Sequence, residues 1–374
     1  MDFEFTDDQL ELRSTARSVL DSACPPSVVR SVYDGQGDGG ELWGTLVALD
    51  WPALGIAEED GGLGLGFLEV GIVVEELGRV VAPTPFLATT TQLAPMLREA
   101  GAGALLSAVA AGTSTGTLAL AERGTWRLDA VRATARRAGA GWVLHGEKEH
   151  VLDGATADEV AVVARLEGTG GHDGLGAFLV PGEALDRRPH EVIDPTMPLA
   201  TVTLDGVEVP TERVLLEPGD PRAAPAIART LQEATTAMAL STTATSRAIF
   251  ETTLQYTKDR EQFGRPIGSF QAIKHRLADL YLAVERAASV AYFAALTIAE
   301  DDARRAVATA MAKAAAGECQ RLVVRDGLQL HGGIGFTWEH DLHFLLKRAT
   351  SGNLLFGGAA AHRAELARLL GLVA

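Results

Sequence analysis

The chain has 374 residues, with 33 Lys and Arg against 49 Asp and Glu, so its formal net charge is −16. Hydrophobic residues make up 47% and charged residues 22% of the sequence, which is typical of a folded globular protein and excludes a mostly disordered chain. Because phosphate neutralisation needs clustered Lys and Arg, so acidic a chain is a poor candidate for nucleic-acid binding.

The two cysteines, Cys24 and Cys319, lie far apart and lack the spacing of zinc ligands, so we expect neither a disulfide scaffold nor a metal site. Residues 1–5 are acidic and do not resemble a signal peptide. The longest mainly apolar stretch, residues 102–112, is about half as long as a membrane span. We therefore expect a cytoplasmic protein that does not enter a membrane.

The first part of the chain, residues 1–112, is predicted to form a helical domain. Thr6 precedes two acidic residues and Gln9, a pattern typical of a capped helix start. Apolar residues between 68 and 80 recur at helical spacing. The glycines of residues 55–64 indicate a loop between these elements.

Residues 113–218 contain short β-prone runs separated by turn residues, in place of the helical pattern that precedes them. We predict a small antiparallel sheet or barrel domain here. Its strands are expected at residues 117–120, 142–144, 160–163, 177–180 and 200–204.

Helical periodicity returns over residues 219–374, after a Pro- and Gly-rich connector at residues 218–221. One apolar stripe runs from Phe270 to Ile298, and a second segment from Val307 to Leu322 continues the pattern. Long Ala-rich helices of this kind pack as a bundle, so we predict a C-terminal four-helix bundle. The predicted fold class is mostly α with a middle β domain.

Two motifs make the prediction specific. Residues 260–271 contain an R-x-x-F-G…F-Q pattern, and residues 329–335 contain Q-x-x-G-G-x-G. Together, and in this order within a helical region, they resemble the FAD-dependent acyl-CoA dehydrogenase family. The resemblance implies α,β-dehydrogenation of an acyl-CoA thioester to a 2,3-enoyl-CoA, with FAD as cofactor and an electron-transfer flavoprotein as acceptor.

The planar guanidinium of Arg260 suits the pyrophosphate of FAD. The resemblance implies that Phe263 packs beside the cofactor, that Gln271 contacts it, and that the 329–333 stretch reaches the FAD of a neighbouring subunit. Glycines in that stretch would let the main chain approach the cofactor closely. The predicted contacts in the stretch are Gln329, His331, Gly332 and Gly333.

The family's catalytic base, a carboxylate near the C-terminus, has no counterpart here. Its position falls at Phe356 or Gly357, and neither side chain can accept a proton. Some family members carry the base on an earlier helix, at a position that corresponds to Ala234 and lies next to Glu233. A one-residue offset rotates a helical side chain by roughly 100°, so Glu233 is a candidate base only if the register differs by one residue.

The middle domain also departs from the family pattern. Of the family's flavin-lining T-E-P-x-x-G segment, only a glutamate and a glycine remain, Glu122 and Gly124. The aromatic residue that often covers the flavin is replaced around residues 150–152.

These departures resemble the base-deficient subunit of bacterial heterotetrameric acyl-CoA dehydrogenases, including those that act on steroid side chains. Such a subunit completes the FAD site of a related subunit that carries the base. Two alternatives stay open. One is a self-sufficient acyl-CoA dehydrogenase, forming a dimer or tetramer with itself and using Glu233. The other is a diverged flavoprotein on the same fold.

Overall fold

The computed structural model describes residues 4–373, and the chain contacts group them into two units. The first, which we call the helical unit, contains the chain up to Gly39, Phe67–Pro83 and the chain from Thr235 onward. The second, the sheet unit, contains Gly40–Gly66 and Thr84–Ala234. The two units therefore interleave along the sequence, whereas the three predicted domains follow one another.

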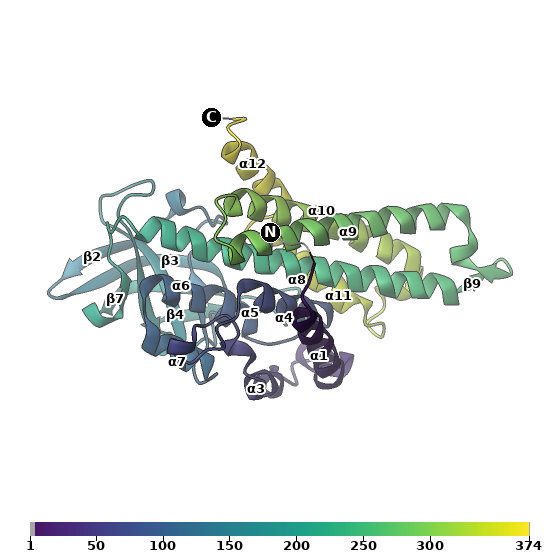
Figure 1. Cartoon of the computed structure of the whole chain (residues 1–374), viewed down its shortest axis with the longest axis horizontal. Helices are drawn as coiled ribbons and strands as arrows, with labels where there is room; N and C mark the ends of the chain where they lie inside the picture. Colours follow the sequence, from purple (N-terminus) through teal and green to yellow (C-terminus); the bar gives the residue numbers. More distant parts are fainter. Residues whose placement is uncertain (1–3, 374) are drawn as a thin grey trace. The chain divides into compact units, whose positions relative to one another are not determined.

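The helical unit is built from long helices. They are α1 (Asp7–Ala23), α2 (Pro26–Tyr33), α4 (Phe67–Arg79), the later part of α8 (Ala223–Asp259), α9 (Gln271–Ala299), α10 (Arg305–His331), α11 (Leu342–Leu354) and α12 (Ala359–Leu369). A short hairpin of β9 (Glu261–Gln262) and β10 (Arg265–Pro266) joins α8 to α9. Figure 1 shows this hairpin at the right-hand end of the two long helices that it connects.

The predicted start of the first helix is confirmed. The Thr6 side chain accepts from the main-chain N–H of Gln9, and the Gln9 side chain accepts from the main-chain N–H of Thr6. This reciprocal capping box satisfies two donors that a helix start otherwise leaves unpaired.

The predicted bundle is also confirmed, because α8, α9, α10 and α11 share one apolar core, and α10 also packs against α12. Ile249, Val284 and Val323 are fully buried in that core. Close approach fixes α11 between its neighbours: a Cβ on Gly352 would lie 2.4 Å from the Thr242 hydroxyl, and one on Gly317 would lie 2.1 Å from Asn353 Oδ1. Only glycine fits such contacts without a shift of the neighbouring atoms.

One helix of the described residues, α9, is long and apolar enough to cross a membrane by length and composition alone. Half of its most apolar window is buried inside the fold. The core helix of a bundle has the same properties, so this helix is weak evidence for a membrane span.

The sheet unit combines short helices with an eight-stranded sheet. Its helices are α3 (Gly40–Ala48), α5 (Phe86–Ala88), α6 (Ala94–Ala100) and α7 (Gly103–Ala110), together with the start of α8. Its strands are β1 (Gly116–Ala119), β2 (Thr134–Ala138), β3 (Gly141–Leu152), β4 (Glu159–Leu166), β5 (Leu175–Pro181), β6 (Asp186–Pro189), β7 (Leu199–Val209) and β8 (Val214–Leu216).

The strand order is β6-β7-β3-β2-β4-β5-β8, and β1 pairs with β4. All five predicted strands are present, but the prediction of purely antiparallel pairing is wrong at two places. β1 and β2 each pair with β4 in parallel, so the sheet is mixed. The predicted order of helical, β and helical regions is confirmed.

Candidate cofactor-binding site

The two motifs lie at the same end of the helical unit. The R-x-x-F-G residues form the end of α8 and the β9–β10 hairpin, and the Q-x-x-G-G residues form the end of α10. Tyr256 joins them, because its ring stacks on His331 at 4.4 Å and its hydroxyl lies 3.4 Å from the His331 carbonyl oxygen. The main-chain N–H of Ile267 donates to the Arg260 carbonyl at 2.8 Å and closes the hairpin.

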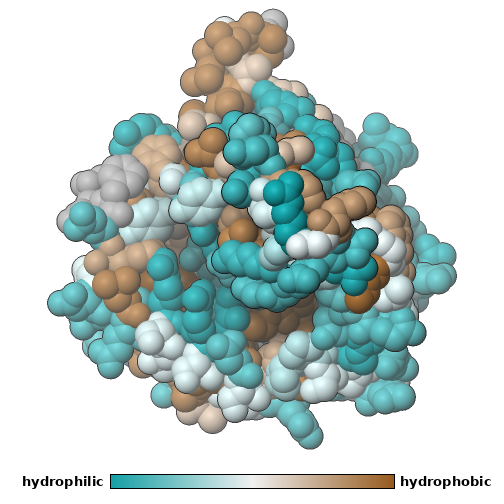
Figure 2. All heavy atoms as spheres, turned by 90° about the vertical axis from the view of Figure 1, so that its right-hand side faces the viewer, coloured by the Kyte–Doolittle hydropathy of each residue, from teal (hydrophilic) through white to brown (hydrophobic). Residues whose placement is uncertain are grey.

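The hairpin presents an exposed cation and an exposed aromatic ring. Phe263 is 92% exposed and has a φ of 55°. A left-handed backbone is rare for a bulky residue, and the ring of Phe263 makes an edge-on contact with Phe270, with the centroids 6.2 Å apart. Arg260 is also exposed, and its side chain has no hydrogen-bond or ion-pair partner among residues 4–373. Figure 2 faces this end and shows a mainly hydrophilic surface with hydrophobic groups between the polar ones.

The neighbouring motif offers exposed amides and an open main chain. Gln271 and Gln329 are both exposed. Gly332 has a φ of 62°, and no atom within the described chain lies within 4 Å of a Cβ placed on Gly332 or Gly333. The main chain is therefore accessible from outside this chain at both glycines.

His331 differs from its neighbours because it is buried. Its Nδ1 lies 2.8 Å from the Gly327 carbonyl oxygen, so that nitrogen carries the proton. Burial lowers the pKa of His331, which keeps the ring neutral and makes Nε2 an acceptor. In the described part of the chain, this buried Nε2 has no hydrogen-bond partner.

This donor set fits FAD. An unpaired guanidinium suits the pyrophosphate, an exposed phenyl ring suits an aromatic ring system, and open glycines allow close approach. The residues that would hold the cofactor are those the motifs predict: Arg260, Phe263, Gln271, Gln329, His331, Gly332 and Gly333. Their roles remain predictions.

The two residues predicted at the family's base position, Phe356 and Gly357, lie in the turn between α11 and α12. Phe356 is buried there and has a φ of 61°, and Gly357 follows with a φ of 95°. Lys313, from α10, donates to the carbonyl oxygens of Asn353 and Gly357 at 2.7 and 2.9 Å. Neither of the two residues predicted at the family's base position, Phe356 and Gly357, has a side chain that can accept a proton.

Glu233 belongs to the sheet unit and is engaged in ion pairs. Its carboxylate lies 2.5 Å from Arg98 Nη2 and 3.4 Å from Arg229 Nε, and only 3% of the residue is exposed. Opposite charge from Glu233 raises the pKa of Arg98 against the lowering effect of burial. Glu233 stays a prediction as a base, but its observed partners give it a structural role.

Glu122 also has a structural role. Its carboxylate accepts from Lys148 Nζ at 2.6 Å and from the main-chain N–H groups of Arg132 and Ala133 at 2.7 and 3.0 Å. Lys148 is fully buried, and burial lowers its pKa against the opposing effect of Glu122. This network holds β3 to the segment that precedes β2.

An aromatic pair lies where the sequence lacks the family's flavin-covering residue. Trp126 and His150 stack with their ring centroids 5.9 Å apart. His150 has a φ of 52°, and His190 packs edge-on against it at 5.7 Å. Trp126 therefore places an indole ring beside the segment where the prediction found no aromatic residue.

Sequence reasoning missed a polar stretch inside a helix. Residues Thr89–Leu93 form a π-helical turn between α5 and α6, and Thr89, Thr91 and Gln92 are almost completely buried. The Gln92 amide nitrogen has no partner among the described residues. π-Turns occur often at functional sites, and the T-T-T-Q run within an apolar helix is the signal that could have revealed it.

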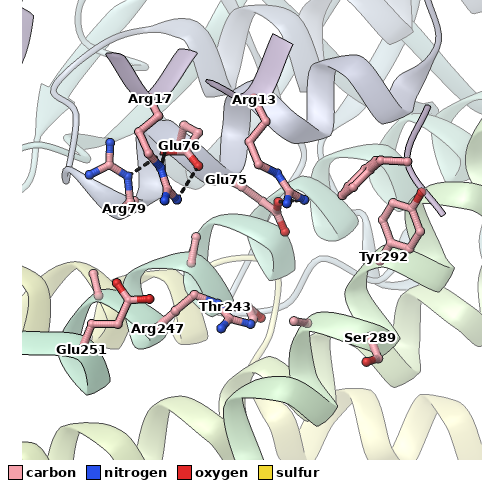
Figure 3. Close-up of a pocket in the computed structure, with 14 residues that line it drawn as sticks. Arg13, Arg17, Glu75, Glu76, Arg79, Thr243, Arg247, Glu251, Ser289 and Tyr292 are labelled. Atoms are coloured by element: carbon pink, nitrogen blue, oxygen red, sulfur yellow. Dashed lines mark hydrogen bonds and ion pairs between the residues drawn. The ribbon is translucent and has the colours of Figure 1, made fainter. Parts of the chain in front are cut away.

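A separate cleft of about 490 Å³ opens in the helical unit between α1, α4, α8 and α9 (Figure 3). Arg17 and Arg79 both bind the buried Glu76, with bonds of 2.6–3.1 Å. Burial raises the pKa of Glu75 to about 7, although 24% of its side chain is exposed and Arg13 lies 4.0 Å away. None of the predicted cofactor residues lines this cleft.

No group of three His, Cys, Asp or Glu side chains within residues 4–373 is placed to hold a metal ion. Cys24 and Cys319 are both free and buried.

Comparison with known sequences identifies the family. The chain matches the acyl-CoA dehydrogenase N-terminal domain over residues 6–117 and the acyl-CoA dehydrogenase C-terminal domain over residues 224–371. It therefore belongs to the acyl-CoA dehydrogenase family, oxidoreductases that act on acyl-CoA thioesters with FAD as cofactor.

Three similar proteins illustrate its relationships. The chain is 33% identical to acyl-CoA dehydrogenase IpdE2 of Mycobacterium tuberculosis, over 90% of this chain and 89% of that one. It is 31% identical to a chain of a variant of the Tcur3481–Tcur3483 steroid ACAD, with a TM-score of 0.86 and 98% coverage of both chains. It is 26% identical to a chain of the ChsE4–ChsE5 complex from Mycobacterium tuberculosis, with a TM-score of 0.89 over the full length of both.

Proposed function

We propose that this chain is the base-deficient subunit of a heteromeric, FAD-dependent acyl-CoA dehydrogenase. The missing base carries the proposal: counted along the sequence, the family's base position falls at the buried Phe356 or at Gly357, and neither side chain can accept a proton. No carboxylate follows it before Glu365. The subunit would complete the flavin site of a related chain that supplies the base.

The exposed end of the helical unit supports this role. Phe263 projects from the β9–β10 hairpin, and Arg260 carries an unpaired charge beside it. Both are arranged to contact something outside this chain. In the complete enzyme, Arg260 would bind the pyrophosphate, Phe263 would pack on the cofactor, and the 329–333 main chain would approach it. FAD supplies the redox chemistry once it is bound.

The similar structures also support a heteromer. Two of them are described by paired names, ChsE4–ChsE5 and Tcur3481–Tcur3483, and the second is described as a steroid enzyme. We propose by analogy that the substrate is the acyl-CoA thioester of a fatty acid or of the side chain of a steroid. An electron-transfer flavoprotein as acceptor and a cytoplasmic location complete the proposal.

The self-sufficient alternative depends on Glu233. A base must be free to accept the substrate proton, whereas Glu233 is buried between two guanidinium groups. These ion pairs favour the heteromeric alternative.

Flavin content and acyl-CoA titration test the proposal. We would purify the chain alone and together with a related chain encoded beside it, and then measure FAD per protein from the absorption spectrum. The expected result is little flavin on the chain alone and one FAD per pair of unlike subunits. Bleaching of flavin by octanoyl-CoA under anaerobic conditions, in the chain alone, would refute the proposal.

A further inference from the structure

Lys313 is a fully buried lysine without a counter-ion. It lies on α10, and no carboxylate forms an ion pair with it among the described residues. A buried charge is normally paired, because removing a lone ion from water is unfavourable. The chain's other fully buried lysine, Lys148, follows this rule through Glu122. Lys313 therefore needs a different explanation.

Lys313 can be buried without a counter-ion because its neutral amine has as many N–H donors as there are carbonyl oxygens beside it. Burial lowers the pKa of Lys313 to about 7, so the neutral amine is available near neutral pH. A neutral amine has two N–H donors, and two carbonyl oxygens, those of Asn353 and Gly357, lie within 2.9 Å of Nζ. Asn353 is in the last turn of α11, whose carbonyl groups lack partners within the helix.

His362, on α12, contacts the same turn. Its Nε2 lies 2.9 Å from the Phe356 carbonyl oxygen. Burial, and then the charge of Lys313, lower the pKa of His362 to about 4. Two further carbonyls of the turn accept from the main chain: Gly357 N–H donates to Leu354, and His362 N–H donates to Gly358.

This turn holds Phe356 in a left-handed conformation. A φ of 61° at a bulky residue is unfavourable and persists only where the surroundings enforce it. Here the surroundings are the side-chain nitrogens of the buried Lys313 and the partly buried His362, from two helices, bonded to three carbonyl groups within five residues.

We propose that Lys313, assisted by His362, is a positioning residue that fixes Phe356 at the base position of the acyl site. The placement of that site rests on the proposed function. We call the hydrogen bonds of Lys313 and His362 to the α11–α12 turn the clamp, and the evidence for it is these contacts alone. Its role is to keep the phenyl ring where other members of the family carry a carboxylate.

Amide hydrogen exchange of residues 350–358 tests the clamp. Lys313→Met keeps the length of the side chain but removes both donors, so the turn should exchange about tenfold faster. Arg321→Met is the matched control, because Arg321 is exposed on the same helix. The control should leave exchange of the turn unchanged. Equal exchange in Lys313→Met and the unmodified chain would overturn the proposal.

A double-mutant cycle separates positioning from mere stabilisation. Glycine adopts a left-handed backbone without strain, so Phe356→Gly should make the turn independent of the clamp. Lys313→Met should then accelerate exchange by less than about threefold in the Phe356→Gly background. The same acceleration in both backgrounds would mean that Lys313 only satisfies carbonyl groups, and would refute a positioning role.

If Lys313→Met does not fold, His362→Phe replaces it in the same cycle with the same expected outcomes. These measurements use neither FAD nor acyl-CoA. A negative result in hydrogen exchange would therefore not contradict the proposed function. A negative result in the flavin titration would not affect the hydrogen-exchange test of the clamp.

Discussion

Arg98 and Glu233 form an ion pair within the sheet unit, with Nη2 and Oε1 2.5 Å apart. Arg98 is 42% exposed along its side chain, whereas the Glu233 side chain is 3% exposed. The two partners are therefore not equivalent. Loss of the arginine leaves a buried carboxylate, and loss of the carboxylate leaves a guanidinium that water can reach.

This asymmetry gives a first prediction. Arg98→Met should lower the free energy of unfolding by about 3 kcal/mol, because it leaves Glu233 buried with only the more distant Arg229. Glu233→Gln should cost about 1 kcal/mol. Urea unfolding of both variants tests whether Arg98→Met has the lower free energy of unfolding.

Turnover of the assembled enzyme distinguishes a structural Glu233 from a catalytic one. We expect Glu233→Gln to retain activity within about tenfold, since the base is proposed to lie in the other subunit. Loss of turnover in Glu233→Gln but not in Arg98→Met would instead identify Glu233 as the base.

A second prediction concerns flavin retention. The Arg260 side chain is exposed and has no partner among the described residues, so Arg260→Ala should change the free energy of unfolding by less than about 0.5 kcal/mol. If the guanidinium binds the pyrophosphate, the same variant should weaken FAD binding by at least about tenfold. Flavin titration of the apo-complex measures this, with Arg321→Ala as control. Unchanged affinity would contradict the placement of the pyrophosphate.

A third prediction concerns the buried pair in the sheet unit. Lys148→Met leaves the Glu122 carboxylate buried without its cation and should lower the free energy of unfolding by about 3–5 kcal/mol. The double variant Lys148→Met/Glu122→Gln removes both charges and should be more stable than Lys148→Met alone. Chemical denaturation of the three proteins tests the order. A double variant less stable than Lys148→Met would show that Glu122 serves mainly Arg132 and Ala133.

The sequence predicted the helical elements well because their signals are local. The Thr6 capping box and the apolar stripe from Phe270 to Ile298 lie within single helices, so periodicity and end signals suffice. The parallel pairing of β1 and β2 with β4 is not local. It depends on contacts between residues as far apart as Gly116 and Glu159, which a single sequence does not reveal.

The candidate site divides in the same way. Arg260, Phe263 and the glycines at 332 and 333 follow from short motifs, and the structure places them on one exposed end. The ion pair between Glu233 and Arg98 was beyond prediction because Arg98 precedes Glu233 by 135 residues. Lys313 was missed for the same reason: nothing in an Ala-rich helix indicates that one lysine reaches a turn 40 residues later.

The pH dependence of stability gives the last prediction. Lys313 has a pKa of about 7 in the folded chain and the ordinary value of 10.5 when unfolded. Between these values the unfolded chain binds one more proton, so the free energy of unfolding should rise with pH from about 7 to about 10.5. The slope from this group is at most about 1.4 kcal/mol per pH unit. His362 acts likewise in a lower window, from about 4 to 6.5, because its folded pKa is also lowered. Thermal unfolding of Lys313→Met, subtracted from that of the unmodified chain, should isolate the upper window. A difference that stays constant from pH 7 to pH 10 would show that the lysine remains charged when folded.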